Sequence, residues 1–293
     1  MNKQLIKGYI FVILSAVIFG LMPLMAKFIY ADGVNPITLV LLRNIISAPI
    51  LALLAKFSGA SVRITPKAVP EISIIALMGC CITPLLLFSS YNHIPSGTAT
   101  VFHFIYPAAV VFGEFAFLKT KFTLGHIISV FMCVIGICLF YNPSDSINLT
   151  GSGFALLSGI TYAIYVIMLS GFKNKELSGF VFSFYVSVVC SAVMLLICVL
   201  TNTLSLPSSL AGWGLSVVFA IAVNVGAVVL FQKGTFIAGG GRASILSTFE
   251  PVTSIVAGVL ILNEKINLQT FAGTVMVILA SILIAICDMK KAE

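Results

Sequence analysis

Long apolar runs separated by short polar gaps are the feature that most constrains this chain. A membrane-spanning α-helix needs about 20 mostly apolar residues, and ten segments meet that need. We predict helices over residues 8–30, 36–57, 69–91, 97–118, 123–141, 152–170, 178–200, 211–233, 240–262 and 267–286. Turn-forming residues cluster in the gaps, and no gap is long enough for a soluble domain. The pattern predicts an all-α integral membrane protein with ten transmembrane helices.

The composition favours a protein whose main solvent is lipid. Hydrophobic residues make up 60% of the 293 residues and charged residues 9%, whereas soluble proteins are about 25% charged. A net charge of +7 would suggest a nucleic-acid partner in a soluble protein. Here the basic residues lie in short gaps between apolar runs, so we expect a lipid bilayer and no nucleic acid. The run after Lys3 and Lys7 is too long for a signal peptide, which predicts a retained first helix.

The positions of Lys and Arg predict an orientation. If the helices alternate in direction from a cytoplasmic N-terminus, 13 of the 16 Lys and Arg residues lie in inner gaps and tails. Only Lys265 then lies in an outer loop, and Lys27 and Arg43 lie within helices. The positive-inside rule therefore predicts that both termini are cytoplasmic. We expect a multi-pass protein of the cytoplasmic (inner) membrane.

The chain also repeats itself at an offset of 143–144 residues. In the clearest stretch, Gly97, Ala99, Pro107, Leu118, Lys121 and Leu124 recur as Gly241, Ala243, Pro251, Leu262, Lys265 and Leu268. We predict two repeats, residues 1–146 and 147–293, with five helices each. Because five is odd, the second repeat enters the membrane from the opposite side. Such inverted repeats can exchange conformations, so that a site between them opens to either side of the membrane.

Several motifs along the chain are not explained by hydrophobicity alone: Pro23-Leu-Met-Ala-Lys27, Gly33-Val-Asn-Pro36 with Arg43, Tyr91-Asn-His-Ile-Pro-Ser-Gly97, Tyr106-Pro107, Phe249-Glu-Pro-Val252 and Leu262-Asn-Glu-Lys265. Together they resemble the EamA-type branch of the drug/metabolite transporter superfamily. The resemblance implies ten helices, cytoplasmic termini, a central cavity between the halves, and export or uptake of metabolites. One departure concerns the acid-base pair Glu264-Lys265, whose counterpart in the first half is Thr120-Lys121. The family pattern therefore assigns no role to Glu114.

Glu250 lies about ten residues into the predicted helix 240–262. An ionisable side chain at the centre of a membrane helix costs roughly 2.5–3.5 kcal/mol on insertion scales. Pro251 follows it, and a proline lets a helix bend and frees an upstream carbonyl group. A carboxyl group there can hold a proton or a cationic group, since apolar surroundings favour its neutral form. We predict a substrate-binding or proton-coupling role; the alternative is a carboxyl group that ties this helix to a neighbour.

Tyr106-Pro107 is the repeat counterpart of Glu250-Pro251. Inverted symmetry would place both pairs at one cavity, and both prolines are predicted bend points. His103 lies three residues before Tyr106, on the same helical face. It can relay protons or bind a substrate, or it can be satisfied by a backbone carbonyl group or water.

Three further charged residues lie within predicted helices, and we predict gating or structural roles for them. Glu114, near the inner end of its helix, is either a gate carboxylate or a side chain that reaches the interface or pairs with Lys119 or Lys121. Lys27 is close to an outer helix end and can snorkel to the interface. Arg43 lies deeper and needs a fixed carbonyl or carboxylate partner. For Arg43 we favour a structural or gating role over contact with substrate.

Weaker candidates for the cavity lining are polar and aromatic residues in or next to the predicted helices. Tyr162 is the repeat counterpart of Phe19, and an asparagine within a membrane helix needs a hydrogen-bond partner. The candidates are Asn92, Tyr162, Tyr165, Asn224 and Gln232.

The function that we predict is secondary transport of small organic metabolites, namely amino acids, amphipathic metabolites or organic cations, in the direction of export. The chain has no Gly-x-x-x-x-Gly-Lys-Ser/Thr loop for ATP; proton coupling and uncoupled facilitation both stay open. The alternatives are an intramembrane lipid-modifying enzyme, which needs a cluster of His, Asp or Glu, and a non-transporting scaffold, which needs soluble domains or long tails. We expect no catalytic residue, metal or cofactor, and a monomer or homodimer.

Overall fold

The computed structural model describes residues 3–94, 96–139, 148–174, 177–262 and 268–290. In these residues all regular structure is helical, as predicted. The α-helices are α1 (Lys3–Gly20), α2 (Met22–Ala31), α3 (Pro36–Phe57), α4 (Ala68–Ala76), α5 (Thr83–Ser90), α6 (Ser96–His103), α7 (Tyr106–Leu118), α8 (Leu124–Cys138), α9 (Leu149–Gly171), α10 (Gly179–Thr201), α11 (Leu210–Phe219), α12 (Val229–Ala238), α13 (Gly240–Leu246), α14 (Phe249–Leu262) and α15 (Leu268–Lys290). Two π-helical stretches, η1 (Leu77–Ile82) and η2 (Ala220–Val228), join α4 to α5 and α11 to α12.

Several of the helical segments are suited to crossing a membrane. In the described part of the chain, six are long and apolar enough: Lys3–Ala31, Pro36–Phe57, Ala68–Ser90, Leu149–Gly171, Gly179–Thr201 and Leu210–Ala238. Shorter apolar helices cover Tyr106–Leu118, Leu124–Cys138 and Phe271–Ala280. The protein is therefore a multi-pass membrane protein, and the count of ten crossings stays a prediction.

Three of the predicted helices are each divided into two. The chain breaks at Leu21 between α1 and α2, at residues 104–105 between α6 and α7, and at residues 247–248 between α13 and α14. Each break is followed by a proline in the first turn of the next helix: Pro23, Pro107 and Pro251. Proline has no N–H group and is tolerated in the first turn, where that group has no intrahelical partner.

Two of these irregularities recur at one spacing. The breaks at 104–105 and 247–248 are 143 residues apart, and the first residues of η1 and η2, Leu77 and Ala220, are also 143 residues apart. A π-helical turn is rare and often marks a functional site. These four deviations from regular helix therefore follow the same offset as the sequence repeat, whereas the break at Leu21 has no counterpart in α9.

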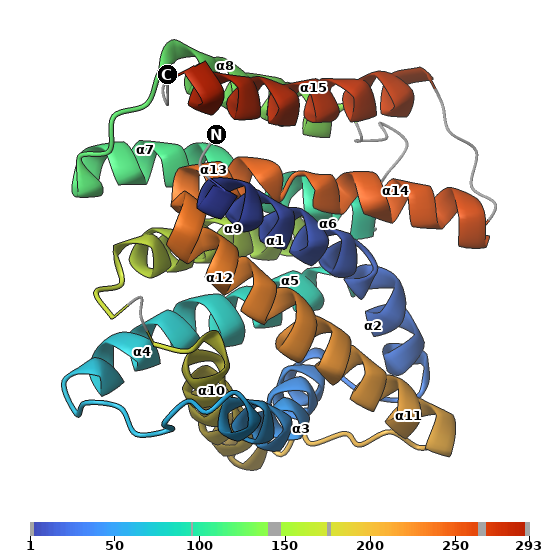
Figure 1. Ribbon diagram of the computed structural model, residues 1–293. Helices are drawn as coiled ribbons and strands as arrows, with labels where there is room; N and C mark the ends of the chain where they lie inside the picture. The colour runs from blue at the N-terminus through green and yellow to red at the C-terminus, as the bar shows by residue number, and fades with distance from the viewer. Residues whose placement is uncertain (1–2, 95, 140–147, 175–176, 263–267, 291–293) are drawn as a thin grey trace.

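The helices pack in layers (Figure 1). α8 and α15 lie side by side at one edge of the molecule, and α3 and α10 pack together at the opposite edge. Between these pairs, α1 packs on η2, α12 and α14, whereas α9 packs on η1, α5, α6 and α7. The first helix of each half is thus packed mainly on the other half.

Glycines allow α1 and α9 to approach the broken helices closely. A Cβ atom at Gly20 would lie 2.6 Å from the carbonyl oxygen of Glu250, and one at Gly159 would lie 2.5 Å from that of His103. Small residues permit such backbone contact between membrane helices. Both glycines therefore position the backbone next to a break.

A group of polar contacts, the Asp32 contact, joins the end of α2 to the start of α11. The carboxylate of Asp32 accepts hydrogen bonds from the Ser208 hydroxyl at 3.0 Å and the Ser209 amide at 3.1 Å. Bonds from Ser209 and Ser208 hold the pKa of Asp32 below its ordinary value of 3.8. Nearby, the amide of Asn35 donates to the Ser205 hydroxyl at 2.8 Å. These bonds link residues of the first half to residues of the second.

A second group, the Glu114 contact, joins α7 to the start of α13. The buried carboxylate of Glu114 accepts hydrogen bonds from the amides of Gly240 at 2.8 Å and Gly241 at 3.0 Å. The Gly240 amide also donates to the Ser170 hydroxyl of α9 at 3.2 Å. Glu114 therefore faces the first amides of another helix, rather than reaching the interface or pairing with a nearby lysine. A negative charge is favourable at a helix N-terminus, where amide groups lack intrahelical partners.

Candidate functional site

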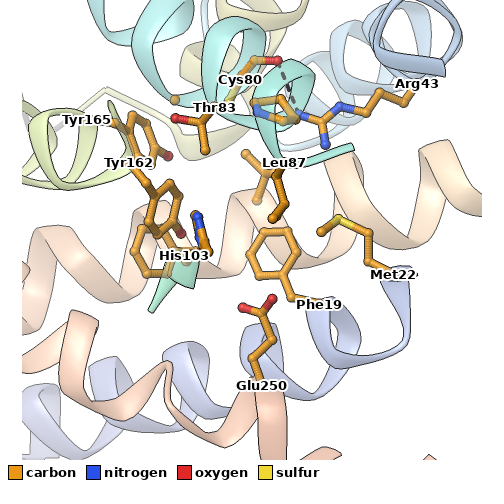
Figure 2. A pocket seen from close by; sticks show the side chains of 14 residues that line it. Phe19, Met22, Arg43, Cys80, Thr83, Leu87, His103, Tyr162, Tyr165 and Glu250 are labelled. Carbon is orange, nitrogen blue, oxygen red and sulfur yellow. Dashed lines mark hydrogen bonds between the residues drawn. The ribbon is translucent and has the colours of Figure 1, made fainter. Parts of the chain in front are cut away.

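A cavity lies between the two halves of the chain (Figure 2). Its volume is about 50 Å³, which holds several water molecules. Its lining comes from helices of both halves: Phe19, Met22, Arg43, Gly79, Cys80, Thr83, Pro84, Leu87, His103, Tyr162, Tyr165, Val228, Phe231 and Glu250. Five of the predicted site residues, Arg43, His103, Tyr162, Tyr165 and Glu250, meet at this one cavity.

Glu250 supplies the only carboxylate among the residues that line this cavity. It is the second residue of α14, directly after the break, and its carboxylate points into the cavity. Across the described residues, neither oxygen has a hydrogen-bond or ion-pair partner. The N-terminus of α14 favours a negative charge at this position. A carboxyl group held in this way is free to bind a proton or a cationic group.

His103 is held in one orientation at the end of α6. Its Nδ1 atom lies 2.8 Å from the hydroxyl oxygen of Ser158, which itself donates to the carbonyl of Ala155 at 2.6 Å. Since a serine hydroxyl has one proton to donate, His103 must donate from Nδ1. In the neutral ring, Nε2 is then left as a hydrogen-bond acceptor. His103 can therefore accept a proton or a donor group at the cavity.

Aromatic rings form one wall of the cavity. The ring of Tyr162 lies 5.4 Å from that of Tyr165 and 5.7 Å from that of Phe231, measured between centroids. Tyr106 does not line the cavity but lies behind this wall, 4.7 Å from Tyr162 in an edge-to-face arrangement. The Tyr106 hydroxyl is buried and has no hydrogen-bond partner among the described residues. Aromatic faces of this kind suit apolar groups and cations.

Arg43 reaches the cavity from α3. Its side chain is 3% exposed, and Nη2 donates to the carbonyl of Cys80, in η1, at 3.2 Å. The guanidinium group also lies 5.8 Å from the centroid of the Phe88 ring. Its Nε atom is buried without a hydrogen-bond partner in the described part of the chain. The sequence predicted a fixed carbonyl or carboxylate partner, and the partner is a carbonyl. Arg43 also lines the cavity.

Four further predicted residues lie elsewhere. Gln232 of α12 is buried, and its side-chain oxygen accepts a hydrogen bond from the Ser183 hydroxyl. The amide of Asn224 donates to the carbonyl of Arg43 at 3.1 Å and to the side chains of Asn44 at 2.9 Å and Ser47 at 3.1 Å, so it ties η2 to α3 outside the cavity lining. Asn92 is exposed in the turn after α5. Lys27 is exposed on α2, in keeping with a snorkelling side chain.

Most of the other lining residues carried no chemical signal in the sequence. Phe19, Met22, Pro84 and Leu87 are apolar residues within apolar runs. However, four pairs of lining residues are separated by the repeat offset of 143–144: Phe19 and Tyr162, Met22 and Tyr165, Pro84 and Val228, Leu87 and Phe231. Extending the repeat from Tyr162 and Tyr165 would have found Phe19 and Met22, but not Pro84 or Leu87.

Comparisons with known proteins agree on one family and fold. A family model described as the EamA-like transporter family matches residues 6–142 and 149–286. An uncharacterized transporter of Clostridium kluyveri is 22% identical over 94% of this chain and 92% of its own length. The uncharacterized transporter YcbK of Bacillus subtilis is 24% identical over 92% of this chain and 90% of its own length. The uncharacterized inner membrane transporter YicL of Salmonella typhimurium is 22% identical over 98% of both chains. One solved crystal structure has the same fold, with a TM-score of 0.78 at 16% identity over 98% of this chain and 99% of that chain.

Proposed function

Because the chain belongs to the EamA-like transporter family, we propose that it is a secondary transporter that exports small organic metabolites across the cytoplasmic membrane by alternating access. Residues 1–146 and 147–293 form two inverted five-helix repeats, giving ten crossings with both termini in the cytoplasm. The solute binds in the cavity of Figure 2. Its passage is coupled to protons through Glu250.

The observation that carries this proposal is the pairing of the cavity lining. Four pairs of lining residues are related by the repeat offset, so the cavity is built from equivalent positions of both halves. The helix breaks beside Tyr106 and Glu250 and the stretches η1 and η2 share that offset. A binding site between two related, oppositely oriented halves is typical of transporters that work by alternating access.

The two inter-half contacts also support alternating access. In the proposed topology the Asp32 contact lies on the outer side and the Glu114 contact on the inner side. Figure 1 draws α2 and α11 at one end of the molecule and the junction of α12 with α13 toward the other. A cavity bounded by such contacts opens to one side when one set breaks while the other holds.

Proton coupling rests on the setting of Glu250. Its carboxylate has no partner in the described part of the chain, and the Nε2 atom of His103 is a second proton acceptor at the same cavity. A carboxyl group that exchanges its proton for a cationic solute links the two movements. Uncoupled facilitation would leave transport independent of a pH gradient.

Transport by purified protein in proteoliposomes tests the proposal. A panel of labelled amino acids, amphipathic metabolites and organic cations is supplied with and without a pH gradient. We expect at least one solute to accumulate with the gradient, and Glu250→Gln to abolish the dependence on it. Glu71→Gln, which removes an acid of α4 outside the cavity lining, is the matched control. Gradient-dependent transport by Glu250→Gln across pH 5.5 to 8 would disprove the coupling role.

The topology has its own test. Alkaline phosphatase fused to the C-terminus is active only outside the cytoplasm, and green fluorescent protein fluoresces only inside it. Fluorescence without phosphatase activity is expected. The reverse result would overturn the proposed orientation and leave the transport assay unaffected.

A further inference from the structure

Two side chains of opposite charge, Glu250 and Arg43, line the same cavity without pairing with each other. We propose that the transported solute is an extended zwitterion, with a cationic group held by Glu250, an anionic group held by Arg43 and an apolar body between them. This inference rests on the proposed transport function and names its substrate class. It gives Arg43 a role in binding beyond the structural or gating role expected from the sequence.

Arg43 has unused capacity to bind an anion. A guanidinium group carries five N–H donors, and in the described chain only Nη2 has a hydrogen-bond acceptor, the carbonyl of Cys80. Nε is buried and has no hydrogen-bond partner among the residues that the structure describes. No carboxylate of the described residues forms an ion pair with this group, although its side chain is only 3% exposed. A buried charge that lacks a partner is costly, and an anionic group of a solute would offset that cost.

Glu250 offers a carboxylate that can bind a cationic group. Its carboxylate points into the cavity and has no partner among the described residues. The aromatic wall of Tyr162, Tyr165 and Phe231 lines the same cavity. A carboxylate with aromatic faces nearby is a suitable environment for an ammonium group.

The two charged groups lie at opposite ends of the cavity lining. In Figure 2 the side chains of Phe19 and Leu87 lie between the Glu250 carboxylate and the Arg43 guanidinium. A solute that contacts both groups therefore passes these apolar side chains, which suits a body longer than the single carbon between the charges of an α-amino acid. A solute with a single charge would leave the other protein charge without a partner. A zwitterion with an apolar spacer compensates both charges and places its spacer against apolar side chains.

The asymmetry of these charges supports a role in substrate choice. The repeat counterpart of Glu250 is Tyr106, and the residues 143 and 144 positions after Arg43 are Val186 and Ser187. Whereas four pairs of the lining follow the repeat, neither charge does. We therefore assign Glu250 and Arg43 to recognition of the solute, and the paired lining residues to the architecture that the two halves share.

Equilibrium binding to purified protein in detergent tests this inference without requiring transport. The probes are ω-amino acids of increasing length: glycine, 4-aminobutanoate, 6-aminohexanoate and 8-aminooctanoate. Affinity should rise from glycine to one of the longer members. The methyl ester and the N-acetyl derivative of that member should each bind about tenfold or more weakly, because each removes a charged hydrogen-bonding group.

Substitutions test which protein side chain binds each charged end of the solute. Arg43→Gln should bind the free acid and its methyl ester equally, and Glu250→Gln should bind the free amine and its N-acetyl derivative equally. Arg43→Lys, which keeps the charge, should retain the preference for the acid and shows that a folded protein is being measured. Lys27→Gln, an exposed cation on α2, should change neither preference.

Two outcomes would overturn the inference. Glycine binding as tightly as the longer members, or equal binding of the acid and its ester by the unaltered protein, would each show that the two charges do not act together. In either case transport of another solute in proteoliposomes would leave the proposed function standing. Failure of all solutes in that assay would reject transport itself.

Discussion

Replacing Glu114 with alanine should loosen the start of α13. The carboxylate accepts the amides of Gly240 and Gly241, and all three groups are buried. After truncation the Gly240 amide still has the Ser170 hydroxyl at 3.2 Å as an acceptor. The Gly241 amide has no second acceptor in the part of the chain that the structure describes. The substitution thus removes two hydrogen bonds, and only the Gly240 amide keeps an acceptor.

The size of the effect follows from these bonds. A hydrogen bond to a charged group contributes about 1.5–3 kcal/mol, and a buried donor left unpaired loses that contribution in full. Because one of the two amides keeps an acceptor, we expect a loss of about 2–3 kcal/mol in the local opening free energy. At 1.4 kcal/mol per tenfold change, this corresponds to amide exchange that is about 30- to 150-fold faster.

Hydrogen–deuterium exchange read by mass spectrometry measures this directly on peptides that contain residues 239–242. Glu114→Gln keeps one acceptor oxygen and should give a smaller acceleration. Glu71→Ala, in the first turn of α4, should leave these peptides unchanged. Equal exchange at α13 in the parent and in Glu114→Ala would refute the reasoning.

Three further predictions follow from the packing and the charges. Gly159→Val should lower the melting temperature in detergent by a few degrees, since its Cβ atom would lie 2.5 Å from the His103 carbonyl oxygen. Gly153→Val is the control: its Cβ atom meets open space, so the melting temperature should stay the same. Asn224→Leu should lower the same temperature, because it removes hydrogen bonds to three groups of α3, while the order of preferred solutes stays the same. Asp32→Asn should leave the pH profile of transport between pH 5.5 and 8 unchanged. Because the pKa of Asp32 is held below 3.8, its contact is intact above that value and is lost only as the pH falls through the lowered pKa; an altered profile would assign this residue a part in coupling.

The membrane character of the chain could be predicted because it depends on composition alone. Glu250 could be found for a similar reason: an acid amid apolar residues is costly unless it serves a purpose. Arg43 was expected to have a carbonyl or carboxylate partner, and the structure shows the carbonyl of Cys80. For these residues, the type of the residue and its depth in the membrane-spanning segment are enough to predict that it needs a partner or a function.

Other contacts could not be read from the sequence, because their partners are remote. Glu114 meets Gly240, 126 residues further along, although two lysines lie much closer in the chain. Asn224 bonds to Asn44, 180 residues away, so its need for a partner was predictable but the identity of that partner was not. The divided helices at Pro107 and Pro251 were expected as bends, whereas η1 and η2 lie in runs that look like uninterrupted helix.

The crossed packing of α1 and α9 has a consequence for how the protein is made. Gly8 of α1 fits against Ile237, a residue that the ribosome adds 229 positions later. Until then α1 sits in the bilayer without its main neighbour, so the N-terminal half emerges as an unfinished body. Each half leaves its first helix without its main packing partner, and the other half supplies that partner. Two separately translated halves should therefore find each other in the membrane and assemble, as two proteins from separate genes would.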